Sequence, residues 1–152
     1  MNKRQKILLI ESVAVVLVTL IAVVAMINAK DWINRSEAMR AMDQLGQRVQ
    51  QYQEARGSVP PESYVTNIKK SLAGHVRLGD LKYRGQWIDF ESSPDEILAY
   101  SQKVYRSSLL PDGYVVLRLN GTVEWLGKKE FEEELARRQS QKEAEILRGH
   151  PL

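Results

Sequence analysis

The longest apolar stretch lies close to the N-terminus, at residues 7–27, where 21 residues contain a single charge, Glu11. A helix of about 20 apolar residues spans a hydrocarbon core of roughly 30 Å. No other stretch of the chain approaches this length. The pattern therefore predicts one transmembrane helix at residues 7–27, to which the rest of the chain is attached.

The apolar positions that follow this run recur with the period of a helix. Their spacings of 4, 3, 4 and 3 residues place them on one helix face, and they are Ala38, Met42, Leu45, Val49 and Tyr52. Because no Pro or Gly occurs before Gly46, the pattern predicts one continuous helix from about residue 5 to Arg56. Gly46 falls on its polar side, and Gly57 followed by Pro60 and Pro61 ends it.

This apolar stripe has two interpretations. A stripe of only about two heptads is typical of a helix face that packs on its own domain, and it also fits a coiled-coil seam with a second helix. In the second case the same side chains form an assembly surface between subunits, together with Glu11 in the membrane.

The chain then changes to shorter elements. Residues 61–73 predict a second helix, which Gly74 ends. Short strands are expected between glycines and a Ser-Ser-Pro-Asp turn, at residues 76–78, 81–83, 87–90 and 97–105.

The strongest local signal is an Asn-Gly pair at 120–121 between two β-rich runs, which predicts a hairpin over residues 114–126. A two-residue loop would place Leu117 opposite Glu124, whereas a three-residue loop places it opposite Val123. We favour the longer loop, because it gathers apolar side chains on one face.

A charged helix is expected after the hairpin, over residues 128–148, with Phe131 and Leu135 docking it and its last turns solvated. The pattern as a whole predicts an α+β fold, in which a long N-terminal helix, transmembrane then amphipathic, packs on a small antiparallel sheet with a C-terminal helix. The expected segments are a cytoplasmic tail (1–6), the transmembrane helix (7–27), its amphipathic continuation (28–57), a small extracytoplasmic α+β domain (58–136) and a charged C-terminal helix or tail (137–152).

The net charge of +3 is concentrated in front of the apolar run. Lys3, Arg4 and Lys6 precede the run, whereas residues 12–152 carry 19 basic and 18 acidic side chains. A cationic flank of this kind keeps the N-terminus cytoplasmic, so we expect a single-pass membrane protein with its C-terminal domain outside the cytoplasm. A balanced body without a basic stripe argues against a nucleic-acid partner.

A cleaved secretory signal is the rival interpretation of the apolar run. Its apolar core should span about 7–15 residues and end at a small-x-small site. The run here is longer, and the exit Met-Ile-Asn-Ala-Lys at residues 26–30 is a poor site. We therefore expect the run to be retained as an anchor.

Residue types that carry catalytic or ligand chemistry are sparse. The chain has no Cys, and its two His residues, His75 and His150, lack ligand spacing. Neither a Gly-x-Ser-x-Gly elbow nor a phosphate-binding Gly-rich loop occurs in the sequence. The sequence therefore predicts a non-enzymatic protein with no cofactor and no small-molecule substrate.

An acidic loop supplies the metal candidates of the sequence. Asp89, Glu91 and Asp95, followed by Glu96, offer the oxygen ligands that Ca²⁺ prefers. Their spacing matches no calcium-loop motif, so we favour a solvated acidic loop.

Three motifs occur in a set order along the chain. They are Leu9-Ile10-Glu11 with the β-branched and Ala-rich run behind it, the amphipathic stretch 38–52 with its Gly-Ser-Val-Pro-Pro break, and VVLRLNGTVEWLGKKEFEEEL at residues 115–135. Together they resemble the type IV pilin and type II secretion pseudopilin family, and the last resembles a planctomycete-type subset of pilin-like proteins. In the family a peptidase cuts after a Gly about five residues before the Glu. Lys6 stands there, so we expect no processing.

The resemblance implies a role for Glu11. In the family the corresponding Glu lies in the membrane and pairs with the N-terminal amine of a neighbouring subunit. A buried carboxylate needs a cationic partner, and Lys6 is a candidate for it here. The alternative is that Glu11, about one turn inside the cytoplasmic boundary, stays hydrated.

The function that we expect from these features is structural. The resemblance implies a single-pass protein of the bacterial inner membrane that is a subunit or accessory of a secretion or pilus-type assembly. Its partners would be the lipid bilayer and sister pilin-like subunits or a membrane assembly platform. The alternative is a membrane-tethered module that recruits an envelope partner without assembling.

Overall fold

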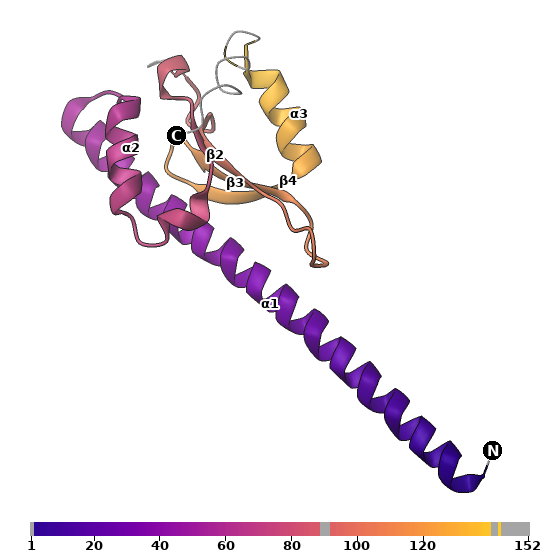
Figure 1. The fold of residues 1–152 in the computed structure, drawn as a ribbon. Coiled ribbons are helices and arrows are strands. Elements are labelled where there is room, and N and C mark those ends of the chain that lie inside the picture. The colour runs from indigo at the N-terminus through magenta and orange to yellow at the C-terminus, as the bar shows by residue number, and fades with distance from the viewer. Residues whose placement is uncertain (1, 89–91, 141–142, 144–152) are drawn as a thin grey trace.

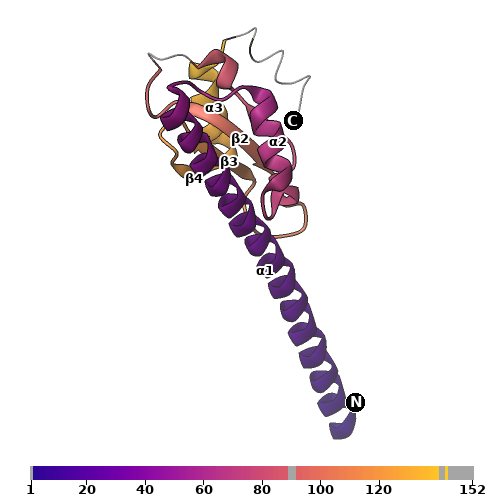
Figure 2. The same ribbon diagram turned by 90° about the vertical axis from the view of Figure 1, so that its left-hand side faces the viewer.

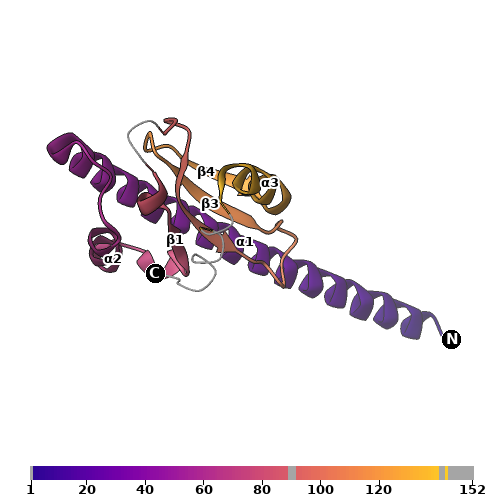
Figure 3. The ribbon, with the colours of Figure 1, turned by 90° about the horizontal axis from the view of Figure 1, so that it is seen from above.

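The computed structural model describes residues 2–88, 92–140 and 143 and has an α+β architecture. One long helix, α1 (Lys3–Arg56), runs from the N-terminus into a folded body. The body contains a four-stranded antiparallel sheet, with α1 on one face and α3 (Lys128–Arg138) on the other (Figures 1 and 3). The predicted fold class is confirmed.

Helix α1 confirms the prediction of one continuous helix. Its 54 residues extend over about 80 Å at 1.5 Å per residue. Gly57 ends it in the left-handed conformation, with φ 68°, and donates its N–H to the carbonyl of Gln53. The N-terminal half of α1 stands free of the body, whereas the C-terminal half lies along the sheet (Figures 1 and 2).

The apolar stripe of α1 packs on the chain's own sheet, which agrees with a helix face that packs on its own domain and not with a coiled-coil seam. Four of its members are buried, with at most 1% of their surface exposed: Ala38, Met42, Leu45 and Val49. They share one core with Val115 and Leu117 of the sheet, so they hold the helix to its body. This burial corrects the assembly role expected for these four side chains. Tyr52 is half-buried against Tyr64, with ring centroids 4.5 Å apart.

Gly46 lies on the buried side of α1, not on its polar side as the pattern predicted. A Cβ at this position would lie 2.8 Å from Cδ1 of Leu117, so the missing side chain lets the helix approach the sheet closely. One turn further, Nε2 of Gln50 donates to the carbonyl of Asn120 at 2.6 Å. The periodicity misplaced Gly46 because a glycine has no apolar side chain to mark it as core.

Two short helices connect α1 to the sheet. The first, α2 (Glu62–Ser71), confirms the predicted second helix and buries Val65. The strand predicted at 76–78 is wrong, because these residues belong to a 3₁₀ helix, η1 (His75–Leu78). In a strand Val76 and Leu78 would share a face, whereas here Leu78 is buried and Val76 is 75% exposed.

The sheet has the strand order β1-β2-β3-β4. Its strands are β1 (Leu81–Tyr83), β2 (Ile97–Lys103), β3 (Gly113–Arg118) and β4 (Val123–Gly127). The strand predicted at 87–90 is not formed in its described part, where η2 (Gly85–Trp87) is a 3₁₀ turn. Asp89 and Phe90 lie outside the described residues.

Strands β3 and β4 form the predicted hairpin in the favoured register. Leu117 pairs with Val123, and two residues along Val115 pairs with Trp125. The N–H of Arg118 donates to the carbonyl of Thr122 at 2.9 Å, so three residues form the loop between this pair. The last of them is Gly121, whose φ of 85° is one that an L side chain rarely adopts. The hydrophobic pattern therefore predicted the register as well as the turn.

Helix α3 covers the face of the sheet opposite α1. Phe131 fills a second core there with Tyr114 and Val116, so the central strand β3 is buried on both faces. The helix ends at Arg138 and not at 148 as expected, because Gln139 is extended.

After α3, Glu143 is buried and not solvated as expected: it is only 2% exposed and donates its N–H to Oγ of Ser140. Residues 141–142 and 144–152 lie outside the described residues.

Candidate functional site

The free half of α1 is a helix with an apolar surface on all sides. Its large apolar side chains between Ile7 and Met26 are each at least 45% exposed. It is the one helix in the described part of the chain that is long and apolar enough to cross a membrane, and none of its most apolar 18-residue window is buried. A surface of this kind fits a single-pass membrane protein.

The charged groups of this segment lie at one end of it. Lys3, Arg4 and Lys6 occupy the first turns of α1, which Asn2 caps by accepting from the N–H of Lys3 at 2.9 Å. Glu11 follows within the apolar run and forms no ion pair with any described residue of its own chain. Its carboxylate is exposed on the helix surface and accessible to a neighbouring molecule.

The β2–β3 connection, residues 104–112, joins the body to α1 at the end of the apolar run. Oδ1 of Asn28 accepts from the N–H of Leu109 at 2.9 Å, while its Nδ2 donates to the carbonyl of Val24 at 2.8 Å. A hydrogen bond across 81 residues of sequence therefore fixes this loop beside the helix.

Aromatic contacts support the same junction. The ring of Tyr105 stacks on Trp125 with a centroid distance of 6.1 Å, and the guanidinium of Arg35 lies 3.9 Å above the indole. These contacts join α1, β4 and the loop. The angle between the free helix and the body is therefore fixed by these aromatic and cation–π contacts as well as by the hydrophobic core.

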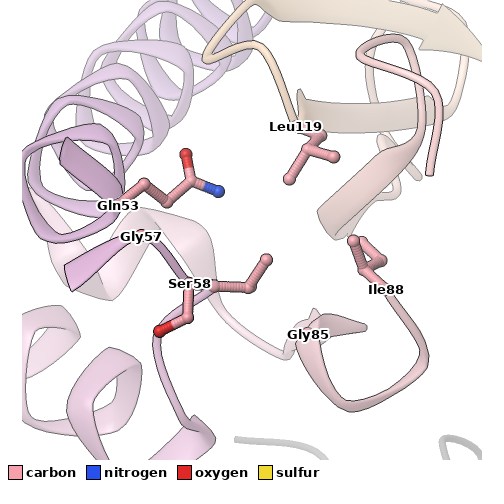
Figure 4. A pocket seen from close by; sticks show the side chains of 7 residues that line it. Gln53, Gly57, Ser58, Gly85, Ile88 and Leu119 are labelled. Carbon is pink, nitrogen blue, oxygen red and sulfur yellow. The ribbon is translucent and has the colours of Figure 1, made fainter. Parts of the chain in front are cut away.

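An apolar pocket lies at the other end of the body, where α1 ends (Figure 4). Its volume is about 500 Å³, and its lining comprises Gln53, Gly57, Ser58, Val59, Gly85, Ile88 and Leu119. The side chains of Ile88 and Leu119 approach it from the sheet side and Gln53 from α1 (Figure 4). Among the described residues, the lining contains no charged group and no nucleophile other than the hydroxyl of Ser58, so this part of the pocket suits an apolar side chain more than a reaction.

Buried ion pairs border the face of the sheet that α3 covers. Arg84 is 2% exposed and bonds to the carboxylates of Glu143 and Glu96, the latter at 2.6 Å, and to the carbonyl of Ile97 at 2.7 Å. Arg138 reaches the second oxygen of Glu96 at 3.2 Å. The cluster links segments that are 12 to 59 residues apart in sequence, which is a structural role.

A second arginine extends this cluster along the hairpin. Arg118 bonds to Glu124 and, at 2.9 Å, to Glu134 of α3. The hydrogen bond from Arg118 holds the pKa of Glu134 below its usual range. Helix α3 is therefore attached to the sheet by charge as well as by its apolar face.

Arginine side chains surround the described part of the acidic loop. The carbonyl of Asp95 accepts from Arg118 at 2.6 Å and from Arg138 at 3.3 Å, and its carboxylate lies 3.4 Å from the amide of Asn120. Two guanidinium groups at this distance oppose the binding of a cation. Asp89 and Glu91 lie outside the described residues, and no group of three His, Asp or Glu side chains suited to a metal ion occurs in the described part.

A group of cations lies where β2 ends beside η1. Nζ of Lys103 donates to the carbonyl of Arg77, and Nζ of Lys69 donates to that of Gly79 at 2.8 Å. Burial, together with the charges of Lys69 and Arg77, lowers the pKa of Lys103 to about 8, although Asp80 opposes this shift.

Replacing Lys103 by Met should therefore remove a pH-dependent contribution to stability. In the folded chain Lys103 loses its proton near pH 8, whereas in the unfolded chain it does so near 10.5. The unfolded state binds more protons between these values, so the contribution of Lys103 to the free energy of unfolding increases as pH rises through this window. Urea unfolding of the full chain in detergent at a series of pH values measures this slope.

Two controls define that measurement. The Lys129→Met variant, at a side chain that is 92% exposed, should show the same slope of unfolding free energy against pH as the unchanged chain. Tyr114 acts in the opposite direction above about pH 10, because burial raises its pKa to about 12 and the folded state then retains a proton that the unfolded state loses. An unaltered slope between pH 8 and 10 in the Lys103→Met variant would contradict the assignment.

Sequence reasoning missed two of the residues that organise these sites. Asn28 was detectable in principle, as the first polar residue after the apolar run. Arg84 was not, because its partner Glu143 is 59 residues away and no local pattern joins them.

Comparisons of this chain with protein-family models, with curated proteins and with solved structures found no match.

Proposed function

We propose that this chain is a non-enzymatic, single-pass membrane protein that serves as a pilin-like subunit or accessory of a secretion or pilus-type assembly. Its N-terminus lies in the cytoplasm and its α+β body outside the inner membrane. The observation that carries the proposal is the exposed apolar half of α1, continuous with a half that is packed on the body. The three family-like motifs and the cationic flank at Lys3, Arg4 and Lys6 support it.

Glu11 is the group through which the membrane helices of neighbouring subunits make contact. Glu11 forms no ion pair with the described residues of its own chain, and an intramembrane carboxylate in this position is stabilised by a cation from a neighbour. Lys6 precedes Glu11 by five residues, so a stagger of about 7–8 Å between parallel helices brings Lys6 of one subunit level with Glu11 of the next.

A charge exchange tests this contact. Glu11→Lys should reduce the recovery of a second, differently tagged copy or sister subunit from solubilised membranes by about tenfold, equivalent to about 1.4 kcal/mol. Lys6→Glu should have the same effect, and the double variant should restore recovery. Glu54→Lys, on the exposed distal part of the same helix, is the matched control and should change nothing.

The distal pocket supports a second candidate function. Its apolar lining at the end of the body furthest from the free helix fits a module that binds an envelope partner while α1 acts only as a tether. Ser58→Arg, at the exposed rim of the pocket, would then abolish partner recovery while the Glu11 and Lys6 variants leave it unchanged. That combination of results would exclude the assembly proposal.

The N-terminal sequence of the mature protein tests the anchor directly. A start before Lys6 agrees with an unprocessed anchor, and a start at Ile7 would show processing of the pilin type. A start at Lys30 would remove the apolar segment and overturn the membrane function.

A further inference from the structure

The β2–β3 loop, residues 104–112, reaches the level at which α1 emerges from its apolar segment. In Figures 1 and 2 this orange loop extends from the sheet toward the free half of the helix. Its backbone is fixed there by the hydrogen bond from Leu109 to Asn28, and the carboxylate of Asp112 closes the loop by accepting from the N–H of Tyr105 at 2.7 Å. The loop therefore has a defined height along the helix.

That height coincides with the edge of a bilayer. The 21 residues of the apolar run extend over about 30 Å, the thickness of a hydrocarbon core, so Ile27 and Asn28 lie at its boundary. Trp32, which is 62% exposed, follows about one turn further, where interfacial aromatics are favoured. A loop bonded to Asn28 lies in this same interfacial layer.

The side chains of the loop have the character of a membrane-contacting surface. Leu109 is 85% exposed, the most exposed large apolar side chain among the described residues, and nothing in the body covers it. Arg106 in the same loop and Lys30 on α1, two residues after Asn28, are exposed cations of the kind that lipid phosphates attract. An apolar tip flanked by cations suits a lipid surface better than bulk water.

We propose that the tip of the β2–β3 loop is a second membrane contact, in which Leu109 inserts into the outer part of the same leaflet from which α1 emerges. This inference rests on the proposed crossing of the membrane by α1. The two contacts, one helix and one loop, together restrict the tilt and rotation of the body relative to the membrane plane. The hydrogen bond to Asn28 satisfies the backbone N–H of Leu109 at the depth where water is depleted.

Single nitroxide labels can measure the depth of this loop, since the chain has no natural Cys. Cysteines replace Val16, Leu109, Val76 and Ser58 one at a time, and the labelled full chains are reconstituted into phosphatidylethanolamine–phosphatidylglycerol nanodiscs. Collision with oxygen reports a hydrocarbon environment, and collision with a nickel chelate reports water. Val76 is the matched control for Leu109, because it is an apolar residue 75% exposed on η1, further along the body.

The expected order of the oxygen-to-nickel ratio is position 16, then 109, with 76 and 58 lowest and equal. Position 109 should exceed position 76 several-fold. If position 16 reports hydrocarbon while 109 matches 76, the loop contact is overturned and the anchor stands. If position 16 reports water, the anchor fails and the loop contact fails with it. A label at 109 that is shielded from both reagents would indicate a protein contact and overturn the proposal.

A charge at the tip distinguishes insertion from mere proximity. A label on Ser107→Cys, exposed in the same loop, should lose its elevated ratio when Leu109→Asp is added. A ratio that stays elevated would show that the bond to Asn28 alone places the loop, and would contradict insertion of Leu109.

Discussion

Replacing Arg84 by Ala is expected to lower the free energy of unfolding by about 3–5 kcal/mol, because it leaves two largely buried carboxylates without this cation. Glu143 is 2% exposed, and the side chain of Glu96 is 18% exposed. The carbonyl of Ile97 also loses a donor at 2.7 Å. Urea unfolding of the full chain in detergent, followed by near-ultraviolet circular dichroism, measures the loss.

Neutral glutamines separate charge from packing in this experiment. In the triple variant R84A/E96Q/E143Q both buried carboxylates are replaced by uncharged amides, so most of the stability should return. Arg48→Ala, an exposed arginine on α1, is the matched control, with an expected change within about 0.5 kcal/mol. A triple variant as unstable as Arg84→Ala would show that the guanidinium acts through packing instead.

Replacing Phe131 by Ala in the otherwise unchanged chain is expected to lower the free energy of unfolding by about 3–5 kcal/mol. The ring is 1% exposed, stacks on Tyr114 with centroids 3.9 Å apart and lies 4.9 Å from Tyr100. It is the one buried residue of α3, so its loss also weakens the ion pair of Glu134 with Arg118. Both global stability and the amide exchange of α3 should report the change.

The controls for Phe131 vary the size and place of the deletion. Phe131→Leu retains most of the apolar volume and should cost much less. Leu135→Ala, one turn along α3 and only partly buried, should give an intermediate value. Amides of α3 that stay protected in Phe131→Ala would contradict the conclusion that this ring fixes the helix to the sheet.

Features whose signal is local could be predicted from the sequence. The length of α1 followed from an apolar run and a stripe with no break between them, and the helix ends at Gly57 as expected. The hairpin register followed from the pairing of Leu117 with Val123. In each case one short window of sequence contains both the period and the terminating residue.

Features that depend on distant partners could not be predicted. Residues 76–78 form too short a segment for its pattern to distinguish a strand from a 3₁₀ turn. The 3₁₀ turn is favoured by the packing of Leu78 against the core, which the sequence does not reveal. Glu143 was expected to be solvated because it lies in a charged stretch of the sequence. Its partner Arg84 is 59 residues away, so the sequence gives no sign of the buried ion pair. The pattern likewise gave no reason to place Leu109 beside Asn28.

The unbroken course of α1 also determines the directions in which its charged groups face. At 3.6 residues per turn, Lys6 and Glu11 are separated by about 140° around the helix axis. The same ideal period puts Lys6 ten turns before Met42 and so at about its azimuth, on the flank that carries the body, while Glu11 faces nearly the opposite way. When Lys6 of one subunit meets Glu11 of another, the two subunits therefore contribute different flanks of their helices to the contact. Such a contact is heterologous. In the proposed assembly its stagger of about 7–8 Å would prevent closure into a pair or a ring, so repetition by successive subunits would produce an open, polar row of molecules.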